Sequence, residues 1–179
     1  VRNTSSDEVL TRLRARHHGS AIALSPYQDP LIQVLVTENK FHHNRQAATL
    51  LSTLLSSWLG NQATTTVIIP IPLGRRRARE RGHNQVETIV RAASSNFRIS
   101  HCLRRSTETK PQSDLARAER FTNVRGAFQL RKAPQGPAGT HFILLDDVIT
   151  TGATLAAARA TLAPHLPPEN TLSCVALAH

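Results

Sequence analysis

The sequence predicts an α/β fold in three αβα layers, with a mostly parallel central sheet between two layers of helices. Segments with helical spacing alternate along the chain with short apolar runs rich in β-branched residues. One such run, residues 142–145, is apolar at every position, as in a strand buried on both faces of a parallel sheet. With 179 residues, 40% of them hydrophobic, the chain can bury one substantial core. We therefore expect a single domain over residues 1–179.

The amino-terminal part predicts two helices around a short strand. Residues 7–17 are expected to form the first helix and residues 20–24 the strand. Asp29 followed by Pro30 is typical of a helix start, because Asp caps the helix and Pro fits its first turn. The buried stripe expected on this second helix consists of Leu31, Val34 and Leu35.

Residues 44–59 have the clearest helical pattern, and Gly60 stands where a C-terminal cap belongs. Its apolar face is predicted to contain Ala47, Leu50, Leu51, Leu54, Leu55 and Trp58. The elements expected after it are a strand at 66–72, an arginine-rich loop at 73–82, a helix at 84–93, and strands at 97–103 and 126–130 around a mobile polar loop at 104–125. A strand at 141–145, a helix at 154–163 and a strand at 171–178 complete the prediction.

Charge and cysteine content restrict the functional classes. The formal net charge is +10, which favours an anionic partner: a phosphate-rich small molecule, nucleic acid or an acidic surface. No apolar run approaches the roughly 20 residues that cross a bilayer, and residues 1–10 lack the apolar core of a signal peptide, so we expect a cytoplasmic protein without a membrane partner. Cys102 and Cys174 lack zinc-ligand spacing and are expected to be buried thiols.

Two adjacent carboxylates, Asp146 and Asp147, follow the apolar run at 142–145. Successive strand side chains point to opposite faces, so both can meet one ligand only if the chain turns there. A buried carboxylate needs hydrogen-bond donors or a metal ion, because an unpaired buried charge costs several kcal/mol. Ribose hydroxyl groups and Mg²⁺ would both meet that need.

The next turn, made of Thr150, Thr151, Gly152, Ala153 and Thr154, is suited to a phosphate. Gly152 permits a left-handed backbone and close approach, and the backbone N–H groups converge where a helix begins. Three threonine hydroxyls add donors. From these residues alone, the expected ligand is a sugar with vicinal hydroxyl groups and a phosphate.

The whole segment 142–154 resembles the phosphoribosyl pyrophosphate (PRPP) motif of type I phosphoribosyltransferases. The resemblance implies that Asp146 and Asp147 hold the ribose hydroxyls and, through the ligand, Mg²⁺, and that the turn from Thr150 to Thr154 binds the 5-phosphate. It implies no turnover of 6-oxopurines, because Thr150 stands where the enzymes that salvage them have an Asp. The acceptor itself cannot be read from the motif.

Other segments resemble the ComF (competence protein F-like) family. The matching motifs are Pro70-Ile71-Pro72-Leu73, then Arg81-Gly82-His83-Asn84-Gln85, and Lys110-Pro111-Gln112 with Asn123-Val124 and Gly126-Ala127-Phe128. Lys40-Phe41 is a weaker match. The four-cysteine zinc module of many members is absent from the sequence, so no zinc is expected.

Basic residues supply the expected remainder of the site. Five arginines lie between positions 75 and 81, and arginine forks suit a pyrophosphate. The pyrophosphate-binding residues expected from them and from the family motifs are Arg75, Arg79, Arg81 and Lys40. In type I enzymes a long loop closes over PRPP. Such closure would bring Arg104, Lys110 and Gln112 of this loop within reach of the ligand. The candidate catalytic residues are therefore Arg104 and Lys110, together with Asp146 and Asp147. Among the histidines, His83 is the one expected to reach a ligand.

Two functions follow as hypotheses. The first is an enzyme that transfers the phosphoribosyl group of PRPP to an unidentified nitrogenous acceptor with release of pyrophosphate. The second is a non-catalytic module that binds PRPP or nucleic acid in DNA uptake or regulation. The net charge favours the second and the intact motif favours the first, while an aromatic content of 4% argues against base stacking as the main mode of DNA binding. Weak nonspecific nucleic-acid binding and a homodimer stay open.

Overall fold

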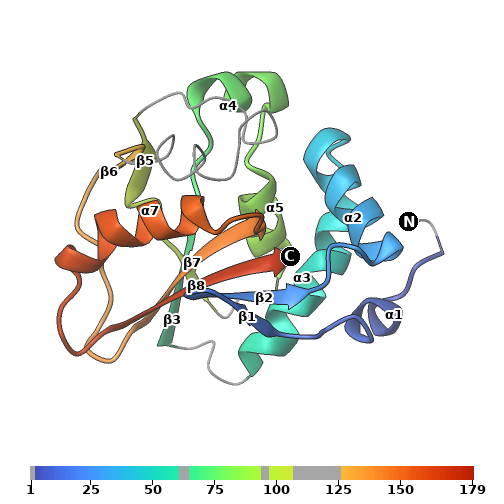
Figure 1. The fold of residues 1–179 in the computed structure, drawn as a ribbon, viewed down its shortest axis with the longest axis horizontal. Coiled ribbons are helices and arrows are strands. Elements are labelled where there is room, and N and C mark those ends of the chain that lie inside the picture. The colour runs from blue at the N-terminus through green and yellow to red at the C-terminus, as the bar shows by residue number, and fades with distance from the viewer. Residues whose placement is uncertain (1–2, 61–64, 94–96, 107–125) are drawn as a thin grey trace.

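The computed structural model describes residues 3–60, 65–93, 97–106 and 126–179, and its centre is a six-stranded sheet (Figure 1). The strand order is β1-β2-β8-β7-β3-β4, and all neighbours are parallel except β1 and β2. The strands are β1 (Arg16–His18), β2 (Ala21–Ser25), β3 (Thr66–Pro70), β4 (Arg98–Ile99), β7 (His141–Val148) and β8 (Thr171–Ala178). The prediction of an α/β fold with a mostly parallel central sheet is therefore confirmed.

Helices cover both faces of the sheet (Figure 1). One face packs against α1 (Ser6–Leu10), α2 (Pro30–Phe41), α3 (Arg45–Leu59) and α5 (Gln85–Ala92). The other packs against α7 (Ala153–Leu162), which ends in the short 3₁₀ turn η3 (Ala163–His165). A small antiparallel pair, β5 (Leu103–Arg105) and β6 (Phe128–Leu130), and the short helix α4 (Arg75–Arg81) lie beside this assembly.

The alternation of side chains along β7 divides the core in two. Ile143 and Leu145 pack among α2, α3 and α5, whereas Phe142 and Leu144 pack beneath α7. All four are completely buried, which explains why this strand is apolar at every position. β7 is consequently packed on both faces of the sheet. This packing also fixes the position of the polar segment that begins after Leu145.

Several predicted boundaries at the amino terminus were wrong. The first helix ends at Leu10 instead of continuing to residue 17, because residues 16–18 turn back as β1 and pair with β2. Val34, expected in the buried stripe of α2, is 47% exposed. The side chains that α2 buries are Ile32, Leu35, Val36 and Asn39.

Two predictions in the middle of the chain also need correction. Residues 73–82 are mainly the helix α4 and not a loop: Gly74 is its N-cap and Gly82, with a φ of 69°, its left-handed C-cap. The strand expected at 97–103 is divided into β4 and β5, and β5 takes the first two residues of the predicted loop at 104–125. Most of that loop, residues 107–125, lies outside the described residues.

Both cysteine thiols are buried, as expected, and burial raises the pKa of each. Cys174 lies in β8, while Cys102 precedes β5. Within the described ranges, none of the helices is long and apolar enough to cross a membrane.

Candidate functional site

The sheet has a topological switch point between β3 and β7. The chain leaves β3 through α4 and α5 and enters β4 on one side, whereas it leaves β7 through α7 and enters β8 on the other side. These two connections also cover opposite faces of the sheet. Ligands of open α/β sheets bind at such a point, outside the carboxyl ends of the strands. Topology alone therefore directs attention to the residues that follow β3 and end β7.

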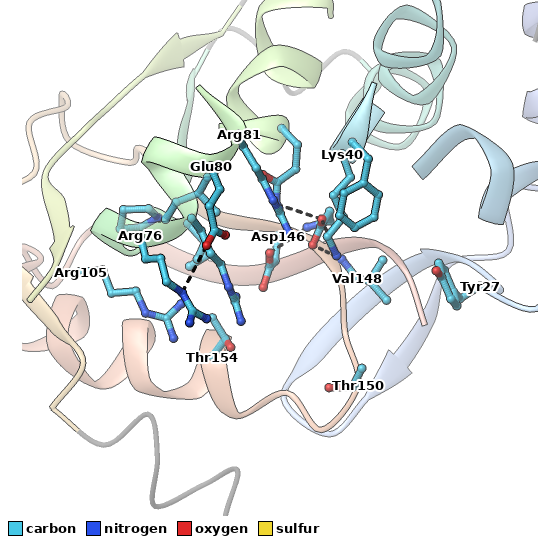
Figure 2. Close-up of a pocket in the computed structure, with 17 residues that line it drawn as sticks. Tyr27, Lys40, Arg76, Glu80, Arg81, Arg105, Asp146, Val148, Thr150 and Thr154 are labelled. Atoms are coloured by element: carbon cyan, nitrogen blue, oxygen red, sulfur yellow. Dashed lines mark hydrogen bonds and ion pairs between the residues drawn. The ribbon is translucent and has the colours of Figure 1, made fainter. Parts of the chain in front are cut away.

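A cavity of about 520 Å³ lies at this point (Figure 2). Its lining comes from the end of α2, the segment after β3, helices α4 and α5, strand β5, and the end of β7 with the turn that follows it. The lining residues that matter chemically are Tyr27, Lys40, Phe41, Arg76, Arg77, Glu80, Arg81, Gln85, Arg105, Asp146, Asp147, Thr150 and Thr154. The volume is in the range of small-molecule sites.

Asp147 is 7% exposed, and protein groups contact both of its carboxylate oxygens. The backbone N–H of Val148 donates to Oδ1 at 2.8 Å, and Gln85 Nε2 donates to Oδ2 at 3.0 Å. Lys40 Nζ lies 3.8 Å from the same Oδ2. These donors compensate for burial of the carboxylate, so the Asp147 side chain is anchored at the edge of the cavity.

Asp146 has a different environment although it is the neighbouring residue. Its Oδ1 accepts the backbone N–H of Asp147 at 2.9 Å, and the side chain is half-buried in the cavity wall. Burial, with the negative charge of Asp147 as the second cause, raises the pKa of Asp146 to about 8. β7 continues to Val148, three residues beyond its predicted end at 145, so both carboxylates belong to the strand, and both nevertheless line the cavity.

The turn after β7 has the local conformation that its sequence predicts. Gly152 has a φ of 76° and is the N-cap of α7, so the left-handed position carries the one residue without a Cβ. Thr151 Oγ1 accepts the backbone N–H of Ala153 at 3.4 Å. Thr150 and Thr154 line the main cavity. A smaller hollow of about 10 Å³ is lined by Asp146, residues 148–150 and residues 152–155.

Helix α4 presents one face to the cavity. Arg76, Arg77, Glu80 and Arg81 line it, in the i, i+1, i+4, i+5 pattern of one helical face. Arg75 and Arg79 are exposed and are not among the lining residues. Of the arginines predicted from sequence to bind pyrophosphate, the structure therefore brings Arg81 to the cavity and places the other two on the outer face of the helix.

Arg81 and Lys40 approach the cavity from two different helices and come close to the carboxylates (Figure 2). The Arg81 guanidinium also lies 5.4 Å from the ring centre of Phe41, a side chain that is 61% exposed. Burial lowers the pKa of Arg81, and the negative charge of Asp147 opposes that effect. Arg76 pairs with Glu80 at 3.6 Å, and its side chain points with Arg105 toward Thr154 (Figure 2).

On β5, alternation decides which arginine meets the cavity. Arg105 lines it and lies 5.4 Å from the ring centre of Phe128. Arg104, the predicted catalytic residue, points the other way and donates to Gln129 Oε1 at 2.8 Å. Lys110 and Gln112, the other candidates from the polar loop, lie outside the described residues.

Sequence reasoning missed the lining residues Tyr27, Arg76, Arg77, Glu80 and Arg105. For those on α4 a signal was present, because good helix formers stand between Gly74 and Gly82, and a helix would have predicted which arginines share a face. For Tyr27 and Arg105 the sequence gives no comparable signal, since their position depends on how distant elements pack.

His83, the one histidine expected to reach a ligand, instead contacts the backbone. Its Nδ1 lies 2.8 Å from the carbonyl oxygen of Arg81 and its Nε2 lies 3.1 Å from that of Asn39. The ring also stacks on His43, with 3.6 Å between centres. The structure thus gives His83 a structural position, in which it joins the end of α2 to the segment between α4 and α5.

Comparison with known proteins gives a consistent set of relatives, although no family model matches the sequence. DNA utilization protein YhgH of Escherichia coli O157:H7 is 32% identical over 147 residues, which cover 75% of this chain and 62% of that protein. Competence protein F of Haemophilus influenzae is 27% identical over 159 residues, or 79% of this chain and 69% of that protein. The chain thus spans about three fifths of the length of the first relative.

A solved structure of a hypoxanthine phosphoribosyltransferase from Staphylococcus aureus aligns with 79% of this chain and 69% of its own, at 12% identity and a TM-score of 0.44. A likeness of that size carries no argument about function. The sequence relatives confirm the resemblance to the ComF family, and the chain is a homologue of proteins named DNA utilization protein YhgH and Competence protein F.

Proposed function

We propose that the chain binds PRPP in the cavity at the switch point and transfers its phosphoribosyl group to a nitrogenous acceptor, with release of pyrophosphate. The observation that supports this proposal is the convergence of three chemically distinct groups on one cavity. They are the carboxylate pair of β7, the threonine turn before α7 and the inner arginines of α4. A ligand with two hydroxyl groups and phosphates at both ends uses all three.

The three groups match different parts of PRPP. In the proposal, the turn at Thr150–Thr154 binds the 5-phosphate, and Asp146 and Asp147 accept hydrogen bonds from the ribose hydroxyls. Lys40 and Arg81, which approach the carboxylates from α2 and α4, bind pyrophosphate. Arg75 and Arg79 face outward and make no contact with the ligand in this arrangement.

Mg²⁺ fits these residues as a partner of the ligand. The described ranges contain no group of three or more His, Cys, Asp or Glu that could hold a metal ion without help. Mg²⁺, however, is commonly held by one or two carboxylates together with the oxygens of a bound phosphate ligand and water. Asp146 and Asp147 would supply the protein oxygens, and the ion would offset the charge of the pyrophosphate.

The chain's contribution to the reaction is then mainly electrostatic. The bond between the anomeric carbon and a pyrophosphate oxygen breaks, and that oxygen keeps the electron pair. The acceptor nitrogen bonds to the opposite side of the carbon and releases its proton to water or to the leaving pyrophosphate. Arginine and lysine donors stabilise the negative charge that develops on the leaving pyrophosphate. The carboxylates hold the ribose in place, so that the carbon is presented to the acceptor in a fixed orientation.

The direct test measures pyrophosphate release from PRPP and Mg²⁺ with a panel of nitrogenous acceptors, beside calorimetric titration of PRPP. We expect PRPP to bind and at least one acceptor to stimulate pyrophosphate release. A protein that binds PRPP but turns over no acceptor would leave a binding module. A protein that does not bind PRPP would contradict the proposal as a whole.

The 6-oxopurines provide a sharper arm of the same assay. Thr150 lines the cavity at the position where purine salvage enzymes of this fold are expected to have an Asp, and a threonine hydroxyl cannot act as a base at neutral pH. We therefore expect negligible turnover of hypoxanthine, guanine and xanthine. Robust turnover of any of the three would show that another group recognises the purine.

A second candidate function is nucleic-acid binding without catalysis. The names of the relatives, DNA utilization protein and Competence protein F, favour it, as do the net charge of +10 and the outward arginines of α4. Binding of this kind falls steeply with salt, because it releases counterions from the phosphates. Titration with single-stranded and duplex DNA at two salt concentrations separates the candidates: excess PRPP displaces the DNA only if both occupy the cavity.

A further inference from the structure

Gln85 is the first residue of α5, and its side chain is 4% exposed although it is polar. It extends from the helix toward the end of β7, where its Nε2 donates to Asp147 Oδ2 at 3.0 Å. The carboxylate that the proposed function assigns to the ribose is thus held by a side chain from a helix 62 residues earlier in the chain. Both residues are buried, and both contribute to the cavity lining.

The position of Gln85 is itself determined from two directions. The preceding residue, Asn84, caps α5 by accepting the N–H of Val86 at 3.0 Å, and its Nδ2 donates to the carbonyl oxygen of Ile71 just after β3. Asn39 of α2, also buried, donates from Nδ2 to the backbone carbonyl oxygen of Gln85 at 3.0 Å. The beginning of α5 is therefore tied to β3, to α2 and, through Gln85, to β7.

The hydrogen bonding of the Gln85 side chain indicates that it does more than fill space in the core. Its Oε1 is buried and has no hydrogen-bond partner within the described residues. An apolar side chain of similar length would fill the space without leaving an oxygen unsatisfied. The donor Nε2 is thus the part of the side chain with a defined partner, and that partner is Asp147.

We propose that Gln85 is a positioning residue that fixes the orientation of the Asp147 carboxylate toward the ligand. The inference rests on the proposed binding of PRPP at this site. With Val148 N–H on Oδ1 and Gln85 Nε2 on Oδ2, the carboxylate cannot rotate without losing a hydrogen bond. Its remaining lone pairs therefore have fixed directions, and a pair of ribose hydroxyls meets an acceptor that is already oriented.

The test compares Gln85→Met, Gln85→Glu and wild type by calorimetric titration with PRPP and, separately, with pyrophosphate, both in the presence of Mg²⁺. The expected result for Gln85→Met is a loss of PRPP affinity of about tenfold, or about 1.4 kcal/mol. Its pyrophosphate affinity stays within about twofold of wild type, because the arginines and Lys40 bind that part. Gln85→Glu, which places a second carboxylate against Asp147, weakens PRPP binding further.

Ser52→Ala supplies the matched control, because Ser52 is equally buried, lies on α3 and donates to the carbonyl oxygen of Thr49, away from the cavity. It is expected to leave both affinities unchanged. Equal weakening of PRPP and pyrophosphate binding by Gln85→Met, or no weakening of PRPP binding, would overturn the positioning role.

If wild type does not bind PRPP, the proposed function itself is contradicted. In that case, crystal structures of wild type and Gln85→Met still test the role of Gln85. An unchanged Asp147 orientation in the variant would overturn the inference about Gln85. A rotated or disordered carboxylate would support it independently of the ligand.

Discussion

The turn after β7 and the helix α4 line the same cavity, yet they depend on their sequences in different ways. In the turn, the proposed binding depends on the backbone conformation of consecutive residues. Gly152, the N-cap of α7, has the left-handed conformation that glycine adopts readily. In α4, five arginines share seven positions, and their function depends on which face of the helix each occupies. A sequence motif can therefore identify a binding site when the site is formed by one continuous segment. A run of charged residues indicates only that the partner is anionic, until the secondary structure shows which of them share a face.

The largest expected effect on PRPP binding comes from replacing the two carboxylates near the end of β7. Replacing Asp146 and Asp147 together by Asn should reduce PRPP affinity by at least 100-fold, because the ribose hydroxyls lose two carboxyl acceptors and a hydrogen bond to a charged group is worth roughly 1.5–3 kcal/mol. The melting temperature should change little, since removal of the penalty on Asp146 offsets the lost contacts of Asp147. Calorimetric titration and thermal unfolding measure the two effects, and unchanged PRPP affinity would remove the motif from the site.

Arginines on the two faces of α4 provide the second test. Arg81→Ala should weaken pyrophosphate and PRPP binding by roughly 1.5–3 kcal/mol, the value of a contact to a charged group. Arg79→Ala, on the outer face of the same helix, should have an effect below about twofold. If the two variants behave alike, the helical face does not select the arginines. If Arg79→Ala instead weakens DNA binding, the outer face belongs to the nucleic-acid hypothesis.

Gly152→Ala tests the turn without removing a charged group. A Cβ at this position meets no heavy atom within 4 Å, so the expected loss of about 1–2 kcal/mol in unfolding free energy arises from the left-handed backbone alone. Gly139→Ala, in the segment before β7, is the matched control, because Gly139 has a φ of 77° and also has no heavy atom within 4 Å of an added Cβ. Both variants should melt at lower temperature, but only Gly152→Ala should also lose PRPP affinity. Equal PRPP affinity in the two variants would contradict a phosphate-binding turn.

The smallest expected effect concerns pH. The pKa of Asp146 is raised to about 8 in the folded protein from an ordinary value of 3.8, so between these values the unfolded chain releases a proton that the folded chain retains. The contribution of Asp146 to stability therefore declines as pH rises from about 4 to about 8. Asp146→Asn should raise the melting temperature at pH 8 by roughly 2–4 °C, the effect of about 1 kcal/mol in a chain of this size.

At about pH 3 and below the difference between Asp146→Asn and wild type should be smallest, because the carboxyl group is then mostly protonated in both the folded and the unfolded chain. Thermal unfolding of both proteins across the pH range provides the measurement. A difference that does not vary with pH would mean that Asp146 titrates near its ordinary value.

Sequence patterns predicted the parts of the fold that depend on strong local signals. The apolar β7, the long helix α3 with Gly60 at its end, and the start of α2 at Asp29 and Pro30 all appear as expected. β1 was missed because its three residues have no strand pattern of their own and form a strand only by pairing with β2. In such a segment the partner decides the structure.

The candidate site shows the same division. Asp146, Asp147, Thr150 and Thr154 all line one cavity, since they lie at the end of one strand and in the turn after it, and their binding of PRPP stays a prediction. Gln85 was visible as part of a family motif, but its contact with Asp147 depends on the packing of α5 beside β7. No periodicity in the sequence reports a contact across 62 positions.

The order of the strands also has a consequence for how the chain folds. Among the described strands, β8 comes last along the chain, yet it lies between β2 and β7, and its pairing with β2 joins Ala21 to Cys174. Until residues 171–178 have emerged, the two strands that flank its position have exposed edges, which are sites of mispairing and aggregation. Pairing across such long sequence separations also favours slow folding. The cavity at the end of β7 is therefore expected to take its final shape late, when β8 closes the middle of the sheet.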